Sequence, residues 1–132
     1  LENIENKDRY HPIAFFSEQV LHDGYAACDL VVARSGAGMI FEIASIGKPS
    51  ILIPLKNSAQ NHQRENAYAY AKSGGALVIE EDNLTPYLLL TEVNALLQNK
   101  KALADMAQAA GKFARFDAAE VIAREIIKIG LH

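Results

Sequence analysis

The sequence predicts an α/β fold, a Rossmann-like parallel sheet covered by helices in a three-layer arrangement. Short apolar segments are bounded by turn-forming or charged residues, and stretches with helical spacing of apolar residues lie between them. The apolar segments are continuous rather than alternating, which is typical of parallel strands buried on both faces. Alternation of strand and helix indicates a parallel sheet with right-handed crossovers. The expected strands cover residues 12–16, 29–33, 50–54 and 76–80, and the expected helices between them cover residues 18–27, 38–46 and 61–71.

Glycine and proline mark the ends of these elements. Gly47, followed by a lysine and a proline, is expected to close one helix, because glycine adopts the left-handed conformation that follows a helix C-terminus. The pair at residues 74–75 is expected to close the next helix. Thr85 and Pro86 predict the start of a third helix, with a hydroxyl at the N-cap and a proline at the first helical position.

The chain from Thr85 onward is expected to be purely helical. Asp117, with Glu120 three residues later, resembles a capping box and predicts the start of a last helix there. One face of this helix is apolar, which predicts that it packs on a core or against another domain. The residues of that face are Ala118, Val121, Ile122, Ile126 and Ile129.

Length and composition predict one soluble globular domain, residues 1–132, without cofactor or metal. Half of the 132 residues are hydrophobic and 22% are charged, which is ordinary for a folded domain of this size. The single cysteine, Cys28, cannot form an internal disulfide, and the four histidines form no zinc-binding pattern with it. A pI of about 5.8 and the lack of a basic stripe argue against nucleic-acid binding. No apolar run reaches the length needed to cross a bilayer, and the amino-terminal residues do not resemble a signal peptide.

The segment before the first expected strand is unusual for a nucleotide-binding sheet. Such sheets normally begin with a strand and a glycine-rich turn, whereas residues 1–11 are polar. We therefore expect a fold truncated on its N-terminal side. A native short protein that begins in this way is the alternative.

Residues 29–42 form the most informative segment, because an apolar strand leads through a turn of small residues into a helix. The free N–H groups of a first helical turn and the helix dipole favour an anion there, and Gly36, Ala37 and Gly38 would let a phosphate approach the backbone. A plain strand-to-helix turn is the alternative. The dinucleotide-binding, nucleophile-elbow and Walker A patterns do not fit this segment. Ser35 is therefore expected to be an N-cap or a phosphate-facing hydroxyl rather than a nucleophile.

Two further groups could hold a sugar. Glu42 lies about one turn into the expected helix, where a carboxylate could accept hydrogen bonds from ribose hydroxyls or could simply favour the helix start. His62, Gln63 and Asn66 follow the third expected strand and offer uncharged donors and acceptors suited to sugar hydroxyls. A capped helix start with solvated amides is the alternative for these three residues.

Taken together, these segments resemble the donor-binding half of the MurG family of bacterial N-acetylglucosaminyltransferases, which make lipid II for peptidoglycan. The resemblance rests on residues 29–38, Glu42, residues 47–54 and residues 62–67 in this order and spacing. It implies the C-terminal half of a GT-B fold, in which two Rossmann-like domains face a cleft. The C-terminal domain binds UDP-GlcNAc, and the N-terminal domain binds the lipid acceptor.

The resemblance implies roles for individual residues in donor binding. The backbone from Ser35 to Met39 would face the diphosphate, Glu42 would bind the uridine ribose, and the residues at 62–66 would contact the GlcNAc hydroxyls or support their loop. The family often has threonine where Met39 stands, so a hydroxyl contact to phosphate would be lost here. The catalytic residues are not assigned within this chain. The implied substrate-binding residues are Arg34, Ser35, Gly36, Ala37, Gly38, Met39, Glu42, His62, Gln63 and Asn66.

The same resemblance implies the partners of the chain. It predicts an inverting, UDP-GlcNAc-dependent transferase whose acceptor, undecaprenyl-diphospho-muramoyl-pentapeptide, binds through an absent N-terminal domain, so that this chain alone is inactive. Membrane contact would be peripheral and made only by that other half, at the inner face of the plasma membrane in the cytoplasm. An exposed edge strand could also pair two copies into a homodimer. The alternatives are a donor subunit of a two-subunit lipid-linked GlcNAc transferase and a nucleotide-sugar-binding module without catalysis.

Overall fold

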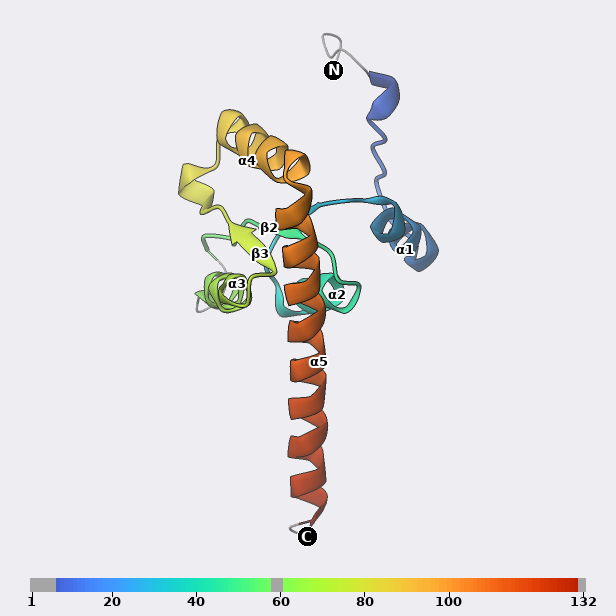
Figure 1. Ribbon diagram of the computed structural model, residues 1–132, viewed down its shortest axis with the longest axis vertical. Coiled ribbons are helices and arrows are strands. Elements are labelled where there is room, and N and C mark those ends of the chain that lie inside the picture. The colour runs from blue at the N-terminus through green and yellow to red at the C-terminus, as the bar shows by residue number, and fades with distance from the viewer. Residues whose placement is uncertain (1–6, 58–60, 131–132) are drawn as a thin grey trace.

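Three short parallel strands and the helices packed around them form the body of the molecule (Figure 1). The computed structural model describes residues 7–57 and 61–130, except for the side chains of residues 7, 117–119, 121–126 and 128–129. The strands are β1 (Val31–Ala33), β2 (Ser50–Leu52) and β3 (Ala76–Val78), and they lie in the order β1-β2-β3. The register pairs Val32 with Ile51, and Ile51 with Leu77. The predicted parallel α/β fold is therefore confirmed.

The helices begin and end close to where the sequence predicts. Helix α1 covers Glu18–Ala27, α2 covers Ala37–Ser45, α3 covers His62–Lys72, α4 covers Pro86–Gln98 and α5 covers Lys100–Gly130, with short 3-10 helices η1 at Lys7–Arg9 and η3 at Glu81–Asn83. Thr85 caps α4 as predicted, because its hydroxyl accepts the N–H of Leu88 at 3.1 Å.

Two expectations about the elements are wrong. Residues 12–16 form no strand, because in the described part of the chain no neighbouring strand lies beside them to complete a hydrogen-bonded ladder. No new helix begins at Asp117, since α5 runs through that position without a break. The actual break comes at Asn99, whose side chain accepts the N–H of Ala102 at 3.0 Å and caps α5. The side chains of the apolar face predicted for residues 118–129 lie outside the described ones.

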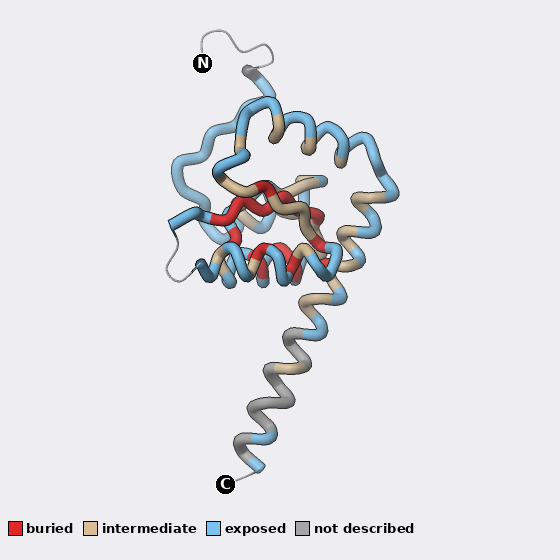
Figure 2. The backbone as a smooth tube through the Cα atoms, turned by 90° about the vertical axis from the view of Figure 1, so that its left-hand side faces the viewer, coloured by how far each residue is buried: buried red, intermediate tan, exposed pale blue. Residues whose placement is uncertain are grey.

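The sheet separates two apolar clusters, which makes the arrangement three-layered. On one face, α2, α3 and α5 contribute buried side chains that pack on Leu52 of β2. On the other face, the partly buried leucines of α4 pack on Ile51, Ile53 and Ile79. Figure 2 shows the buried residues concentrated in the sheet and in the helices on one side of it.

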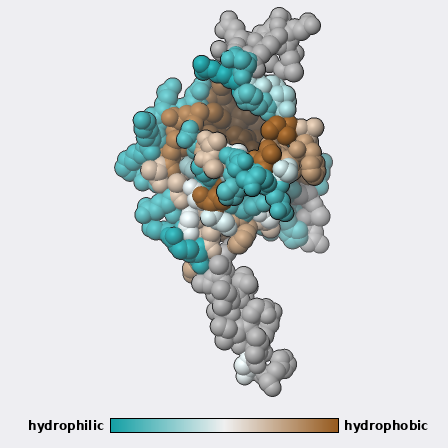
Figure 3. Space-filling model, turned by 90° about the vertical axis from the view of Figure 1, so that its right-hand side faces the viewer, coloured by the Kyte–Doolittle hydropathy of each residue, from teal (hydrophilic) through white to brown (hydrophobic). Residues whose placement is uncertain are grey.

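The second face is less completely covered near β1. Val32, at the centre of that strand, is 43% exposed, although it points to the same side as Ile51 and Ile53. Apolar side chains gather around a hollow on the side of the molecule that carries α1 (Figure 3). The three-stranded sheet therefore buries its α2 and α3 face more fully than its α4 face.

Tyr70 lies at the centre of the better-covered face. Its side chain is fully buried and meets Phe113 of α5 edge-on, with ring centroids 4.9 Å apart. Burial raises the pKa of Tyr70 to about 12. A Cβ placed on Gly75 would lie 2.6 Å from the Tyr70 ring, so only glycine fits at that position. The glycine pair after α3 thus has two roles, because Gly74 supplies the positive φ of 96° and Gly75 makes room for the ring.

Candidate functional site

The candidate site lies at the carboxyl edge of the sheet, where all three parallel strands end. The chain passes from β1 through residues 34–36 into α2, whose N-cap is Gly36. No side chain in the described part of the chain caps this helix start, so its first N–H groups stay available to a ligand. Ligands of open α/β sheets bind outside this edge.

The two glycines of this turn are not required by the fold. Gly36 has φ -61° and ψ 147°, which any residue can adopt. A Cβ added at Gly36 or Gly38 would have no described atom within 4 Å. The absence of side chains here therefore leaves open space over the start of α2, as a site that receives an anion on backbone N–H groups requires.

Ser35 joins the start of α2 to the start of α3. Its side chain is fully buried, and its hydroxyl donates a 2.6 Å hydrogen bond to the backbone carbonyl of Gln63. Of the two roles expected for the Ser35 hydroxyl, the N-cap is wrong, because Gly36 holds that position. The phosphate-facing role does not fit this geometry either, since the buried hydroxyl is engaged by the Gln63 carbonyl. The Ser35 side chain thus fixes the distance between the two helix starts.

The predicted amide and imidazole residues follow on α3. The side-chain oxygen of Gln63 accepts the N–H of Leu55 at 3.0 Å, which ties α3 to the loop after β2. Asn66, one turn later, lines a cavity of about 130 Å³ together with Ala37, so the structure brings these two predicted residues together. His62 is exposed at the first position of α3, after Asn61 with its left-handed φ of 56°.

Glu42 faces α1. Its Oε2 accepts a 3.1 Å hydrogen bond from the hydroxyl of Tyr25, which also lies 3.5 Å from the sulfur of Met39. Burial, followed by the hydrogen bond and charge of Glu42, raises the pKa of Tyr25. The structure thus places Glu42 and Met39 side by side on the exposed surface of α2, in contact with a residue that the sequence analysis did not select.

Arg34 bridges the ends of all three strands. Its guanidinium donates to the carbonyl of Ile53 after β2 at 3.3 Å and to Glu81 after β3 at 2.7 Å. The other Glu81 oxygen accepts the backbone N–H of Lys56 at 3.0 Å. These two contacts, with the N–H of Lys56 the larger, lower the pKa of Glu81. Arg34 therefore links the residues that follow β1, β2 and β3 beside the start of α2.

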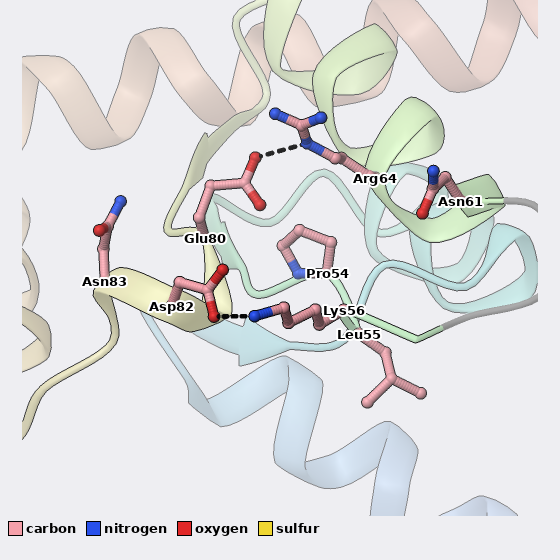
Figure 4. A pocket seen from close by; sticks show the side chains of 8 residues that line it. All are labelled: Pro54, Leu55, Lys56, Asn61, Arg64, Glu80, Asp82 and Asn83. Carbon is pink, nitrogen blue, oxygen red and sulfur yellow. Dashed lines mark hydrogen bonds and ion pairs between the residues drawn. The ribbon is translucent and has the colours of Figure 1, made fainter.

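Acidic residues after β3 form a second part of this edge. Glu80 accepts hydrogen bonds from Tyr68 at 2.7 Å and from Arg64 at 2.8 Å, and these contacts lower its pKa. Asp82 pairs with Lys56 at 2.6 Å. Figure 4 shows both pairs lining a pocket of about 450 Å³ between the loops after β2 and β3.

The acids at residues 80–82 were not among the predicted site residues, although their position in the sequence indicates them. They follow the strand at residues 76–78 directly, and the carboxyl ends of parallel strands meet at one edge of the sheet. Their pairing with Arg34, Arg64 and Lys56 leaves the edge close to charge balance.

The Glu81 contacts predict a dependence of stability on pH. Because the folded-state pKa of Glu81 is lowered, its contribution is present above the ordinary glutamate pKa and is lost as the pH falls through the lowered value. We expect Glu81→Gln to lower the thermal unfolding midpoint more at about pH 7 than at about pH 3. Differential scanning calorimetry at both pH values measures this difference. An equal loss at both values would contradict the assignment.

The described residues hold neither a metal-binding cluster nor a helix able to span a membrane. They contain no group of three or more histidine, cysteine or acidic side chains arranged to hold a metal ion. Within the same residues, no helix combines the length and apolar character that crossing a bilayer requires.

The geometry agrees with the comparisons to known proteins. The glycosyltransferase family 28 C-terminal domain matches residues 2–122, which is most of the chain. The chain belongs to this family. The resemblance inferred from the sequence motifs is thereby confirmed.

Two curated relatives of this family 28 domain carry the same name. The transferase of Desulforamulus reducens is 38% identical over 109 residues, which are 83% of this chain and 29% of the relative. That of Clostridioides difficile is 43% identical over 104 residues, covering 79% of this chain and 25% of the relative. Both are named UDP-N-acetylglucosamine–N-acetylmuramyl-(pentapeptide) pyrophosphoryl-undecaprenol N-acetylglucosamine transferase.

A solved structure supports the same family assignment. The crystal structure of Acinetobacter baumannii MurG superposes with a TM-score of 0.67 at 28% identity, over 77% of this chain and 28% of that one. The family 28 chain thus spans less than a third of the length of these relatives.

Proposed function

We propose that this chain binds UDP-GlcNAc and serves as the donor-binding part of an inverting transferase that passes GlcNAc to undecaprenyl-diphospho-muramoyl-pentapeptide. The observation that carries the proposal is the open start of α2 in a chain of glycosyltransferase family 28. Uncapped N–H groups and two glycines that the fold does not require suit a diphosphate. The names of the relatives favour this acceptor over that of a two-subunit transferase.

In this proposal each predicted residue has a defined task. The backbone from Ser35 to Met39 receives the diphosphate, and Glu42 accepts hydrogen bonds from the ribose. The uncharged side chains on the first turns of α3 face the GlcNAc hydroxyls, and Asn66 lines a cavity together with Ala37 of α2. Arg34 acts through the strand ends that it fastens, since its guanidinium is held by Ile53 and Glu81.

The chemistry follows from where charge develops. In inverting transfer the acceptor hydroxyl, deprotonated by a base, attacks the anomeric carbon, and the bond from that carbon to UDP breaks. Negative charge then grows on the leaving diphosphate, where helix N–H groups stabilise it. We propose that α2 supplies this stabilisation. The base and the lipid-binding surface belong to another part of the enzyme in this proposal, so the chain alone does not catalyse the transfer.

The remaining proposals concern location and assembly. We propose that the protein works in the cytoplasm at the inner face of the plasma membrane and touches the membrane only through its acceptor-binding part. We also propose that two copies pair along the outer edge of β1, which no described strand covers. Sedimentation equilibrium at several concentrations tests the dimer, and a constant monomer mass would reject it.

Gly38→Ala tests the donor site without disturbing the fold. Alanine is the better helix former and has open space here, so we expect the free energy of unfolding to rise by up to about 1 kcal/mol. The same methyl group lies where the diphosphate must approach, so we expect weaker UDP-GlcNAc binding by isothermal titration calorimetry. A variant that is more stable and binds the donor as tightly as the wild type would contradict the proposal.

Gly111→Ala in α5 is the matched control. Among the described atoms, a Cβ there meets the end of the Arg115 side chain at 3.9 Å and nothing nearer, so this change should also stabilise the helix. Because Gly111 lies on α5 and lines neither the start of α2 nor the cavity beside Asn66, this change should leave donor binding unchanged.

A further inference from the structure

Tyr25 is the residue through which α1 reaches the proposed ribose-binding carboxylate. Its hydroxyl donates to Oε2 of Glu42 at 3.1 Å, and its oxygen lies 3.5 Å from the Met39 sulfur. A hydroxyl has one proton to donate, and a carboxylate oxygen is a far stronger acceptor than a thioether. The proton therefore belongs to the bond with Glu42.

The end of α1 is fixed relative to α2, so Tyr25 is held in place. Lys48, in the turn after α2, donates from Nζ to the carbonyl of Cys28 at 2.8 Å. Cys28 in turn closes α1, because its N–H bonds to the carbonyl of Gly24 at 3.0 Å. Tyr25 thus lies within one turn of a helix end that is tied to the body of the molecule.

The hydrogen bond leaves half of the Glu42 carboxylate available. Among the described residues, no group donates to Oε1, and Glu42 is exposed to solvent. A free glutamate side chain must lose rotamer freedom when it binds a ligand, and a partner that already restrains it lowers that cost. The Tyr25 hydroxyl is protonated, and so a donor, throughout the neutral range, because a tyrosine pKa is ordinarily about 10 and burial raises that of Tyr25 further.

We propose that Tyr25 is a positioning residue, which holds Glu42 so that its free oxygen meets the ribose hydroxyls of the nucleotide. This inference rests on the proposed function, because it assigns the Glu42 carboxylate to the ribose. Tyr25 itself touches Glu42 and not the nucleotide. The role requires the hydroxyl, and the aromatic ring alone would not supply it.

The test is a double-mutant cycle in the full 132-residue chain, with Tyr25→Phe, Glu42→Gln and the double variant. The probes are UDP and 2′,3′-dideoxyuridine 5′-diphosphate, which lacks both ribose hydroxyls, and the readout is the Kd from calorimetry. We expect Tyr25→Phe to weaken UDP binding about three- to tenfold, the size of ordering one side chain. It should leave binding of the dideoxy probe unchanged and add no loss in the Glu42→Gln background.

Tyr87→Phe is the matched control, because Tyr87 is 82% exposed on α4 and lies outside the site. It should bind both probes as the wild type does. Equal weakening of both probes by Tyr25→Phe would overturn the positioning role and indicate a purely structural one. Unchanged UDP binding, or losses that add to those of Glu42→Gln, would overturn it as well.

The positioning role of Tyr25 and the ribose contact of Glu42 are distinguished by these variants. If Glu42→Gln weakens UDP binding but Tyr25→Phe does not, only the positioning role is wrong. If the wild type does not bind UDP, or if Glu42→Gln binds UDP as tightly as the wild type, the assignment of Glu42 to the ribose is wrong. The positioning role of Tyr25 is then wrong as well.

Discussion

Replacing Tyr70 with alanine is expected to lower the free energy of unfolding by about 3–5 kcal/mol, the largest loss of stability among the substitutions considered. The ring is fully buried between the sheet and α5 and contacts Phe113, so its removal leaves a cavity that Gly75 cannot fill. The free energy of unfolding of a small domain is only about 5–15 kcal/mol in total, so this substitution removes a large fraction of it. Urea unfolding followed by circular dichroism measures the change.

Tyr70→Phe is the control for this prediction. The Tyr70 hydroxyl is buried and, among the described atoms, has no hydrogen-bond partner. Removing it should therefore leave stability unchanged or raise it, because an unsatisfied buried hydroxyl costs about 1–3 kcal/mol. A loss on Tyr70→Phe as large as that on Tyr70→Ala would show that the ring packing is not the source of the effect.

Replacing Glu42 with alanine is expected to weaken UDP-GlcNAc binding about tenfold to a hundredfold, since hydrogen bonds to a charged group contribute about 1.5–3 kcal/mol. The carboxylate is exposed, with one oxygen held by Tyr25 and the other available to the ribose. Stability should change little, because Glu42 lies outside both apolar clusters. Calorimetric titration gives the two Kd values.

Glu92→Gln supplies the control for charge, since Glu92 lies on α4 and outside the site. It removes the same negative charge and should leave the Kd unchanged. If Glu92→Gln and Glu42→Ala weaken UDP-GlcNAc binding equally, the effect comes from net charge, and the proposed contact between Glu42 and the ribose is wrong.

The sequence predicted helices more accurately than strands, and the reason is physical. Helix α1 begins at Glu18 and ends at Ala27 as expected, because helical hydrogen bonds and caps are local. A β-strand, by contrast, forms its backbone hydrogen bonds with a neighbouring strand. The apolar residues 12–16 therefore satisfied the pattern for a strand without forming one, and the three observed strands are shorter than the apolar segments that contain them.

One predicted helix start was wrong because the same residue types are common both at helix N-termini and on the surface of a continuous helix. Asp117 and Glu120 have the spacing of a capping box, yet acids at this spacing are also common on the surface of a continuous helix such as α5. Asn99, which does cap α5, was preceded and followed by good helix formers and gave a weaker signal.

The candidate site was predictable wherever it depends on one strand-to-helix turn. The open start of α2 after β1 follows from the small residues at 36–38. The bonds that join different elements were not predictable, because Ser35 with Gln63, Arg34 with Glu81 and Tyr25 with Glu42 depend on how strands and helices pack. The contacts of Glu81 and Tyr25 with the site are evident only in the folded structure.

The central claim is that UDP-GlcNAc binds over the start of α2. The most direct test is a titration of the ¹⁵N-labelled chain with UDP-GlcNAc, followed by amide chemical shifts, which suits a protein of 14.4 kDa. We expect saturable shifts at residues 35–39 and at Glu42, with smaller ones at the start of α3. No shifts at millimolar donor, or shifts confined to the acidic pocket at residues 80–83, would contradict the claim.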